Sequence, residues 1–287
     1  MQQNASGAIS ALLARHGFHF SKSMGQNFLI DASVPAAIAE ASEAGEGTGV
    51  LEIGPGIGAL SSCLCRMAGK VVAVELDETL RPLLQETMAP FDRFEVVYGD
   101  ILKIDLHTLV REKFSGLDPI VCANLPYNIT TPVMTKLIES KLFSSITVLV
   151  QKEVAERLCA RPGTAAYGAF SVFMQYYTEP KLLFEVGREC FMPSPKVTSA
   201  VMRAVVREKP PVAVSDEKFF FRTVYAAFAL RRKTLVNSLM TSFSPQLDKA
   251  QLTEIVAACG FPADIRGERL GIAEFAALSE ALQKEMK

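Results

Sequence analysis

Between residues 50 and 150 the chain repeats one pattern, in which a short apolar run rich in β-branched residues precedes a longer amphipathic stretch. Runs that are apolar almost throughout are typical of strands covered on both faces of a sheet. Strands that alternate with helices predict a doubly wound α/β fold with a mostly parallel sheet. The expected strands lie at 50–54, 71–75, 94–98, 120–124 and 146–150, and candidate helices between them include 59–68 and 78–88.

The character of the chain changes after Val206, and this change divides the sequence into two expected domains. Two later strands, near 181–186 and 198–205, bring the expected sheet to seven strands. A Pro-containing segment then indicates a linker. Helical patterns follow at 216–231, 232–243, 248–259 and 272–285. We therefore expect a first domain at 1–207 and a small all-helical domain at 208–287.

The composition, in which 49% of residues are apolar, is sufficient for a sizeable core. No run of about 18 apolar residues occurs, and the N-terminus lacks the charged start and cleavage site of a secretory signal. The six cysteines are scattered, several of them within apolar runs, which is typical of reduced thiols. Neither they nor the three histidines have a metal-ligand spacing. We expect a cytoplasmic protein without a membrane segment or a metal site.

The net charge is −1, whereas a protein that binds nucleic acid is often strongly basic. The distribution of charge partly compensates, because the windows 1–30, 190–207 and 218–247 contain basic residues but no acid. One such window alone would be ordinary solvated surface, but three favour a phosphate-facing surface. Its candidate residues are Arg15, His16, His19, Lys22, Lys196, Arg203, Arg207, Arg222, Arg231, Arg232 and Lys233.

A glycine-rich turn follows the first expected strand, in the segment from Val50 to Gly58. Glycine at such a turn lets the backbone approach a ligand closely at the start of a helix. Glu75 ends the next strand, 21 residues after Gly54. An acid at that place accepts hydrogen bonds from both ribose hydroxyls of a nucleotide-like ligand. A tight strand–helix turn that binds nothing is the plain alternative.

Two cofactors fit this pattern. Gly54, Gly56 and Ala59 satisfy the G-x-G-x-x-G/A fingerprint of NAD-binding proteins. The segment also fits the E-x-G-x-G-x-G pattern of class I (Rossmann-like) methyltransferases, which bind S-adenosylmethionine, with Glu52 as the leading acid. Asp100 follows the third strand, where methyltransferases carry an acid that accepts from the adenine amino group of their cofactor. This third acid favours S-adenosylmethionine.

The segment Asn124–Tyr127 follows the fourth strand and matches the [DNS]-P-P-[YF] loop of amino-methyltransferases, with leucine at the second position. An exocyclic adenine amine is a poor nucleophile because its lone pair is delocalised into the ring. The side-chain carbonyl of Asn124 and the backbone carbonyl of Leu125 can each accept one amine hydrogen, which favours a more tetrahedral nitrogen aimed at the methyl carbon. Tyr127 offers an aromatic face to a base that has left its own stack.

No strong general base is required for this reaction, since the product ammonium loses its proton readily. The lack of clustered His or Cys nucleophiles in the sequence agrees with such chemistry. An ordinary surface turn with Asn and Pro is the alternative for Asn124–Tyr127. Its place after the fourth strand, downstream of a matching glycine loop, favours amine methylation.

With these motifs together, the chain resembles the rRNA adenine N6,N6-dimethyltransferase family over nearly its whole length, and most of all the bacterial small-subunit (16S) RsmA/KsgA branch. The segment Lys22–Leu29 is similar to the family's GQNFL motif, and Phe191–Ser199 to its F-x-P-x-P-K-V-x-S stretch. The resemblance implies that Phe191 is the second aromatic wall of the adenine slot and that Lys196 contacts phosphate. The expected cofactor contacts are Asn27, Leu29, Gly54, Gly56, Glu75, Asp100, Ile101 and Asn124. The expected catalytic residues are Asn124, Leu125, Tyr127 and Phe191.

The resemblance also implies a substrate, namely two adjacent adenines in the hairpin loop near the 3′ end of 16S rRNA. Each would receive two methyl groups from S-adenosylmethionine, within the small ribosomal subunit and as part of its biogenesis. The enzyme would act as a monomer, and its C-terminal helices would help to dock the RNA.

Three other functions stay open at this point. The large-subunit rRNA adenine methyltransferases of macrolide resistance share the glycine loop and an N-x-P-[YF] loop, although the P-x-P-K-V stretch and the long C-terminal domain fit the small-subunit enzyme better. A non-catalytic RNA-binding factor on the same scaffold is disfavoured by the intact Asn124 and Tyr127. An NAD oxidoreductase is the third.

Overall fold

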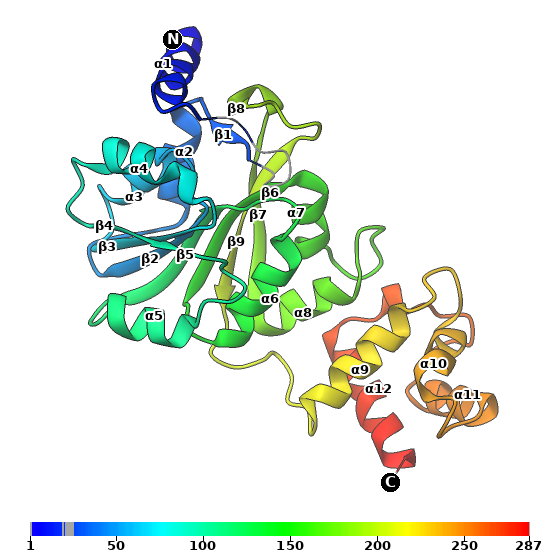
Figure 1. Cartoon of the computed structure of the whole chain (residues 1–287). Helices are drawn as coiled ribbons and strands as arrows, with labels where there is room; N and C mark the ends of the chain where they lie inside the picture. The colour runs from blue at the N-terminus through cyan, green and yellow to red at the C-terminus, as the bar shows by residue number, and fades with distance from the viewer. Residues whose placement is uncertain (1, 19, 21–25, 287) are drawn as a thin grey trace. The chain divides into compact units, whose positions relative to one another are not determined.

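A computed structural model describes residues 2–18, 20 and 26–286, which include a seven-stranded sheet with helices on both faces (Figure 1). The strands are β2 (Thr48–Ile53), β3 (Lys70–Glu75), β4 (Phe94–Tyr98), β5 (Asp118–Asn124), β6 (Ser145–Gln151), β7 (Thr178–Val186) and β9 (Ser199–Val206). Their order is β4-β3-β2-β5-β6-β9-β7, in which β2 to β6 run parallel and β9 runs antiparallel to β6. The predicted mostly parallel α/β sheet of seven strands is confirmed.

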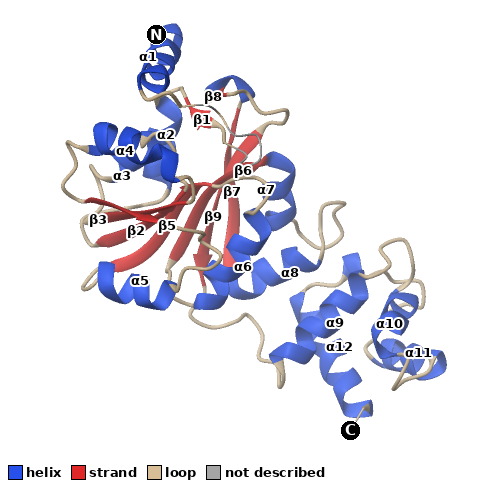
Figure 2. Cartoon of the chain, in the orientation of Figure 1, coloured by secondary structure: helices blue, strands red, loops and turns tan. Residues whose placement is uncertain are grey.

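Helices form a layer on each face of this sheet (Figure 2). One layer contains α2 (Ser33–Ala41), α3 (Ala59–Leu64) and α4 (Arg81–Met88), and the other contains α5 (Leu106–Lys113) and α6 (Thr130–Ser140). Helix α7 (Lys152–Cys159) follows β6 directly. The strand residues at 71–74 and 148–150 are almost completely buried, because both faces of the sheet are covered. This double cover is the physical reason for the nearly continuous apolar runs of the sequence.

The chain divides into two compact units, 1–155 with 181–206 and 156–180 with 207–287. The second unit contains α8 (Ala169–Tyr177), α9 (Glu217–Phe228), α10 (Leu235–Phe243), α11 (Lys249–Ala258) and α12 (Ile272–Glu285). Tyr167 is buried in the core of this unit and donates a hydrogen bond to the backbone oxygen of Leu270 at 3.0 Å. The expected first domain included 156–180, whereas apolar side chains of this segment pack with the C-terminal helices.

Two helices of the second unit begin at side-chain caps. Asp216 accepts a hydrogen bond from the backbone N–H of Phe219 at the start of α9. Asp248 and Gln251 form a reciprocal capping box at the start of α11. Such caps satisfy backbone N–H groups that the helix leaves without partners. They account for the good agreement between the predicted starts at 216 and 248 and the observed helices.

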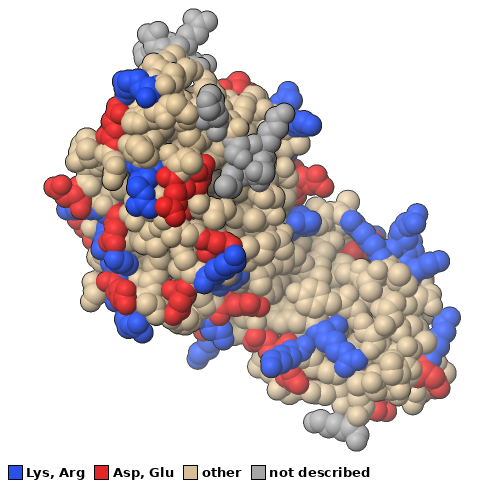
Figure 3. All heavy atoms as spheres, viewed as in Figure 1, with Lys and Arg blue, Asp and Glu red and all other residues tan. Residues whose placement is uncertain are grey.

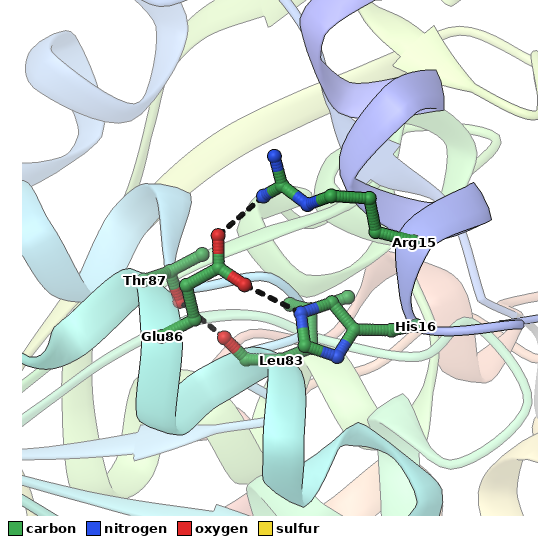
Figure 4. Close-up of polar contacts among 5 residues, drawn as sticks. All are labelled: Arg15, His16, Leu83, Glu86 and Thr87. Carbon is green, nitrogen blue, oxygen red and sulfur yellow. Dashed lines mark hydrogen bonds and ion pairs between the residues drawn. The ribbon is translucent and has the colours of Figure 1, made fainter.

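The N-terminal helix α1 (Gln2–Arg15) is tied to α4 by one carboxylate (Figure 4). Arg15 forms an ion pair with Glu86, and Nε2 of His16 lies 2.6 Å from the other oxygen of that carboxylate. Farther along, the short strand β1 (Phe28–Leu29) pairs antiparallel with β8 (Phe191–Met192). The sequence pattern does not predict this ribbon, because two residues are too few to establish a period.

Several residues of the three acid-free windows are engaged within the protein. Ion pairs join Arg15 to Glu86, Arg203 to Glu43, and Arg207 to Glu179. Lys196, Arg232 and Lys233, in contrast, are exposed. Figure 3 shows Lys and Arg side chains standing out over the helical unit, with Asp and Glu side chains also present there, and basic and acidic side chains intermixed over the sheet unit. His19 and Lys22 lie outside the described residues.

Within the described ranges, no helix is long and apolar enough to cross a membrane. In the same part of the chain, no group of three or more His, Cys, Asp or Glu side chains could hold a metal ion. The six cysteines are free. Burial, helped by the negative charge of Glu52, raises the pKa of the Cys65 thiol to about 12, so this thiol is neutral and unreactive at neutral pH.

Candidate active site

A pocket opens at the carboxyl ends of β2 to β5. The chain leaves β2 toward β3 on one side, and β5 lies on the other, so the pocket is at a topological switch point, where open α/β sheets bind ligands. Its lining includes Asn27, Leu29, Gly54, Gly56, Glu75, Asp100, Ile101, Asn124, Leu125 and Tyr127. The structure therefore brings together all the expected cofactor contacts and three of the four expected catalytic residues.

The glycine turn has a backbone that other residues would strain. Gly54, Gly56 and Gly58 have φ values of 69°, 58° and 83°. A side chain on Gly56 would also meet the ring of Phe28, which lies 3.0 Å from the position that a Cβ would occupy. Glycine is thus required both for the conformation and for the close approach of the N-terminal segment. The turn consequently presents bare backbone to the pocket.

Glu75 and Asp100, two of the pocket acids beyond the turn, are held by local hydrogen bonds. Glu75 is 6% exposed and accepts a hydrogen bond from the backbone N–H of Asp77 at 2.8 Å. Burial raises the pKa of Glu75, and backbone N–H groups near the carboxylate oppose that rise. Asp100 accepts from the backbone N–H of Leu102 at 2.9 Å. Two carboxylates at the ends of neighbouring strands are thus fixed along one side of the pocket.

Glu52 on β2 is another acid in the lining and is 1% exposed. Its Oε2 atom has no hydrogen-bond partner among the described residues. Burial raises the pKa of this carboxyl to about 8; the Ser61 hydroxyl opposes the rise and the negative charge of Glu75 adds to it. Before a ligand enters, the Glu52 carboxyl is therefore protonated at neutral pH.

The stability of the cofactor-free wild type should decrease between pH 5 and 8. We expect the Glu52→Gln variant to show little of this decrease. The pKa of the Glu52 carboxyl is raised from 4.5 to about 8 in the folded wild-type chain. Between these values the unfolded chain has released a proton that the folded chain keeps, so rising pH favours unfolding. At about 1.4 kcal/mol per pKa unit, the effect amounts to a few kcal/mol. Thermal unfolding across this range measures it, and parallel curves for the two proteins would contradict the assignment.

The loop Asn124–Tyr127 is anchored to elements on either side. The backbone N–H of Leu125 donates to the backbone oxygen of Leu149 on β6 at 3.1 Å. The Nδ2 of Asn124 donates to the backbone oxygen of Asn27 at 3.3 Å. That bond uses the NH₂ group of the Asn124 amide as donor. The Oδ1 atom is therefore available to accept a hydrogen bond from a ligand. The loop thus supplies an oriented carbonyl to the pocket.

Tyr127 and Phe191, the two expected aromatic walls of the adenine slot, differ in their position relative to the pocket. Tyr127 lines the pocket, and its hydroxyl lies 2.6 Å from Oγ of Ser199. Phe191 is 3% exposed, belongs to the hydrophobic core that also contains Leu29, and is not part of the pocket lining. Its role as the second wall stays a prediction. Of the GQNFL-like segment Lys22–Leu29, residues 22–25 lie outside the described part of the chain.

Leu76 and Asp77 are among the pocket residues that were not singled out in the sequence. Leu76 is 55% exposed and lines the pocket directly after Glu75. Asp77 accepts a hydrogen bond from Nε2 of Gln26 at 2.7 Å, which ties the N-terminal segment to the end of β3. Leu76 could not be recognised from the sequence, because it follows the apolar run at 71–74 and a leucine there would be expected in the core. The Gln26–Asp77 contact joins positions 51 residues apart and leaves no local signal.

Comparison with protein-family models matches residues 17–260 to the family described as ribosomal RNA adenine dimethylase. Among curated proteins, the chain is 45% identical over 280 residues to "Ribosomal RNA small subunit methyltransferase A" of Geobacillus sp. (strain WCH70), which covers 96% of each chain. A protein of the same name from Bacillus mycoides (strain KBAB4) is 48% identical over 275 residues, or 94% of each chain. The similarity thus extends over nearly all of both proteins.

Solved structures with the same fold include the 23S rRNA methyltransferase ErmE, with a TM-score of 0.70 and 24% identity over 89% of this chain and 99% of that one. A dimethyladenosine transferase from Plasmodium falciparum has a TM-score of 0.74 and 22% identity over 90% of this chain and 98% of the other. These two structures support the fold, while the family model and the curated relatives define the family. The chain belongs to the ribosomal RNA adenine dimethylase family.

Proposed function

We propose that this protein is an S-adenosylmethionine-dependent rRNA (adenine-N6,N6)-dimethyltransferase. Its substrate is two adjacent adenines in the 3′-terminal hairpin loop of 16S rRNA within the small ribosomal subunit. The observation that carries the proposal is the oriented side-chain carbonyl of Asn124 in a pocket that also contains the glycine turn and Glu75. The names of the curated relatives support the choice of the small subunit.

The pocket residues fit this cofactor. Bound S-adenosylmethionine supplies an electrophilic methyl carbon on a sulfonium. Glu75 accepts from the ribose hydroxyls, and Asp100 accepts from the adenine amino group, with Ile101 packing nearby. Gly54 and Gly56 give the methionine part close access to backbone, and the unpartnered oxygen of buried Glu52 offers a further acceptor for a cationic ligand. Asn27 and Leu29 close the same pocket from the N-terminal segment.

The chemistry at the target amine follows from two acceptors. The Oδ1 of Asn124 and the backbone oxygen of Leu125 each take one amine hydrogen, which aims the nitrogen lone pair at the methyl carbon. Such groups act mainly by positioning and by electrostatic complementarity to the charge that develops in the transition state. The face of Tyr127 stacks on the flipped base. The proton of the methylated nitrogen then leaves to water.

The helical unit supplies RNA contacts outside the pocket. Arg232 and Lys233 are exposed there, and Lys196 is exposed on the loop after β8. We assign Arg232 and Lys233 to a docking surface of the helical unit for the phosphate backbone of the RNA, and Lys196 to a separate phosphate contact of the sheet unit. These local charges compensate for the net charge of −1. The enzyme acts as a monomer in the cytoplasm, where small subunits are assembled.

Methylation of isolated ribosomal subunits with labelled S-adenosylmethionine tests the proposal. We expect label in the RNA of small subunits that lack this modification and none in large subunits. Label in the large subunit alone would assign the protein to the macrolide-resistance type of activity instead. Absence of label in both, with intact cofactor binding, would favour a non-catalytic RNA-binding factor.

Charge reversal in Arg232→Glu is expected to weaken binding to the small subunit roughly three- to tenfold at moderate salt. The slope of log affinity against log salt should decrease by about one for the lost phosphate contact. Arg231 is a poorer choice, because its guanidinium donates to the backbone oxygen of Ala165. Lys284→Glu, an exposed position on α12, is the matched control. Equal binding of Arg232→Glu and wild type at every salt concentration would remove Arg232 from the docking surface.

A further inference from the structure

Ser199 has a completely buried hydroxyl at the pocket end of the sheet. The residue is 0% exposed, and its Oγ lies 2.6 Å from the hydroxyl of Tyr127. It is paired with Gln151, the last residue of β6, which places it at the edge where the parallel strands end. A buried hydroxyl costs free energy unless it is hydrogen-bonded. Tyr127 provides that bond, although the two residues are 72 positions apart.

The hydrogen bond to Ser199 also limits the chemical roles that Tyr127 can have. Burial raises the pKa of the Tyr127 phenol, and the Ser199 hydrogen bond opposes that rise. The phenol is therefore neutral under working conditions, and its hydroxyl is engaged with the sheet. A neutral, engaged hydroxyl is unsuited to accept a proton from the target amine, which leaves the ring face as the functional part of the side chain.

We infer that Ser199 is a positioning residue, which holds the ring of Tyr127 at the angle at which the target adenine stacks. This inference rests on the proposed function. The ring is attached through two rotatable bonds, and a hydrogen bond at its far end restrains both of them. Side chains that bind a reacting group work best when such a supporting contact fixes them in advance.

The contribution of Ser199 is larger for the second methyl transfer than for the first. An unmethylated amine has two hydrogens for the acceptors at Asn124 and Leu125. After one transfer a single hydrogen remains, so one of the two acceptor contacts is lost and stacking on Tyr127 carries more of the alignment. A loosened ring should therefore lead to accumulation of the monomethylated base.

A double-mutant cycle with Ser199→Ala and Tyr127→Phe tests the inference. Each variant should slow the second transfer about tenfold, with unchanged cofactor affinity, and raise the ratio of monomethyl to dimethyl adenine. The double variant should be no slower than either single one, because both remove the same bond. Ser145→Ala removes a buried serine at the other end of the β6–β9 pair and should keep the wild-type ratio. Additive losses, or an unchanged product ratio in Ser199→Ala, would overturn the inference.

A second measurement is independent of activity. The chain contains six tyrosines, so fluorine NMR of protein with 3-fluorotyrosine gives a small set of resonances. Loss of one resonance in Tyr127→Phe assigns that ring. We expect this resonance to shift in Ser199→Ala and to stay in place in Ser145→Ala. An unshifted resonance in Ser199→Ala would refute the positioning role, whereas a shift in a protein without methyl-transfer activity would count against the proposed function alone.

Discussion

Replacement of Asn124 by alanine is expected to lower methyl transfer by roughly 10²–10³-fold, the usual loss when one preorganised polar contact to a transition state is removed. The amide is oriented by the bond from its Nδ2 to the backbone oxygen of Asn27 at 3.3 Å, so its Oδ1 is available to the amine. The contact strengthens as the nitrogen becomes tetrahedral, so the loss should appear in kcat and not only in KM. Single-turnover transfer to small subunits measures it.

Asn128→Ala is the matched control for this variant. Asn128 is an exposed residue that lines the same pocket, four positions farther along the chain, and it has no assigned role in the amine chemistry. We expect near-wild-type transfer from the control and a cofactor affinity within a few-fold of wild type for Asn124→Ala. Near-normal turnover of Asn124→Ala would contradict the proposed mechanism.

Replacement of Glu75 by alanine is expected to weaken S-adenosylmethionine binding about 100-fold. A buried carboxylate that accepts from two ribose hydroxyls makes charge-assisted hydrogen bonds worth about 1.5–3 kcal/mol each, partly offset by the cost of desolvating the carboxylate. The side chain is 6% exposed, so water cannot easily replace it as an acceptor. Calorimetric titration with the cofactor measures the affinity directly, without any RNA.

The pH dependence of S-adenosylmethionine binding provides a second test of the role of Glu75. Burial raises the pKa of Glu75, and a protonated carboxyl has one fewer acceptor for the ribose hydroxyls. Cofactor affinity should therefore decrease as the pH falls through the raised pKa, and the decrease should be smaller in Glu75→Ala. Glu78→Ala, at an exposed position paired with Arg81, should behave as wild type in both respects. Equal affinity of Glu75→Ala and wild type would remove Glu75 from the cofactor site.

The central fold was predictable because its signal is local. Strands with both faces covered must be apolar throughout, and the predicted run at 94–98 has the same bounds as β4. The grouping of 156–180 with the C-terminal helices was not predictable, because it depends on contacts such as Tyr167 to Leu270, 103 residues apart. Pairings at such separations leave no periodic pattern. The two-residue β1–β8 ribbon is invisible for the related reason that it is too short.

The candidate site was predictable where glycine, acid and the Asn124–Tyr127 loop follow strand ends, because parallel strands bring such ends to one edge. Charge was less informative, since sequence cannot tell a phosphate-facing arginine from one that is engaged within the fold. Arg203 is an example: it lies in an acid-free window but forms an ion pair with Glu43. The Tyr127–Ser199 hydrogen bond was missed because a serine in a strand is an ordinary residue.

The most direct test of the proposed activity is the identity and position of the methylated bases. Small subunits that lack the modification are incubated with the protein and S-adenosylmethionine, and the digested 16S rRNA is analysed by mass spectrometry. We predict N6,N6-dimethyladenine at two adjacent positions of the 3′-terminal hairpin loop, with four methyl groups transferred per subunit. Methyl groups on another atom, or at another place in the RNA, would contradict it.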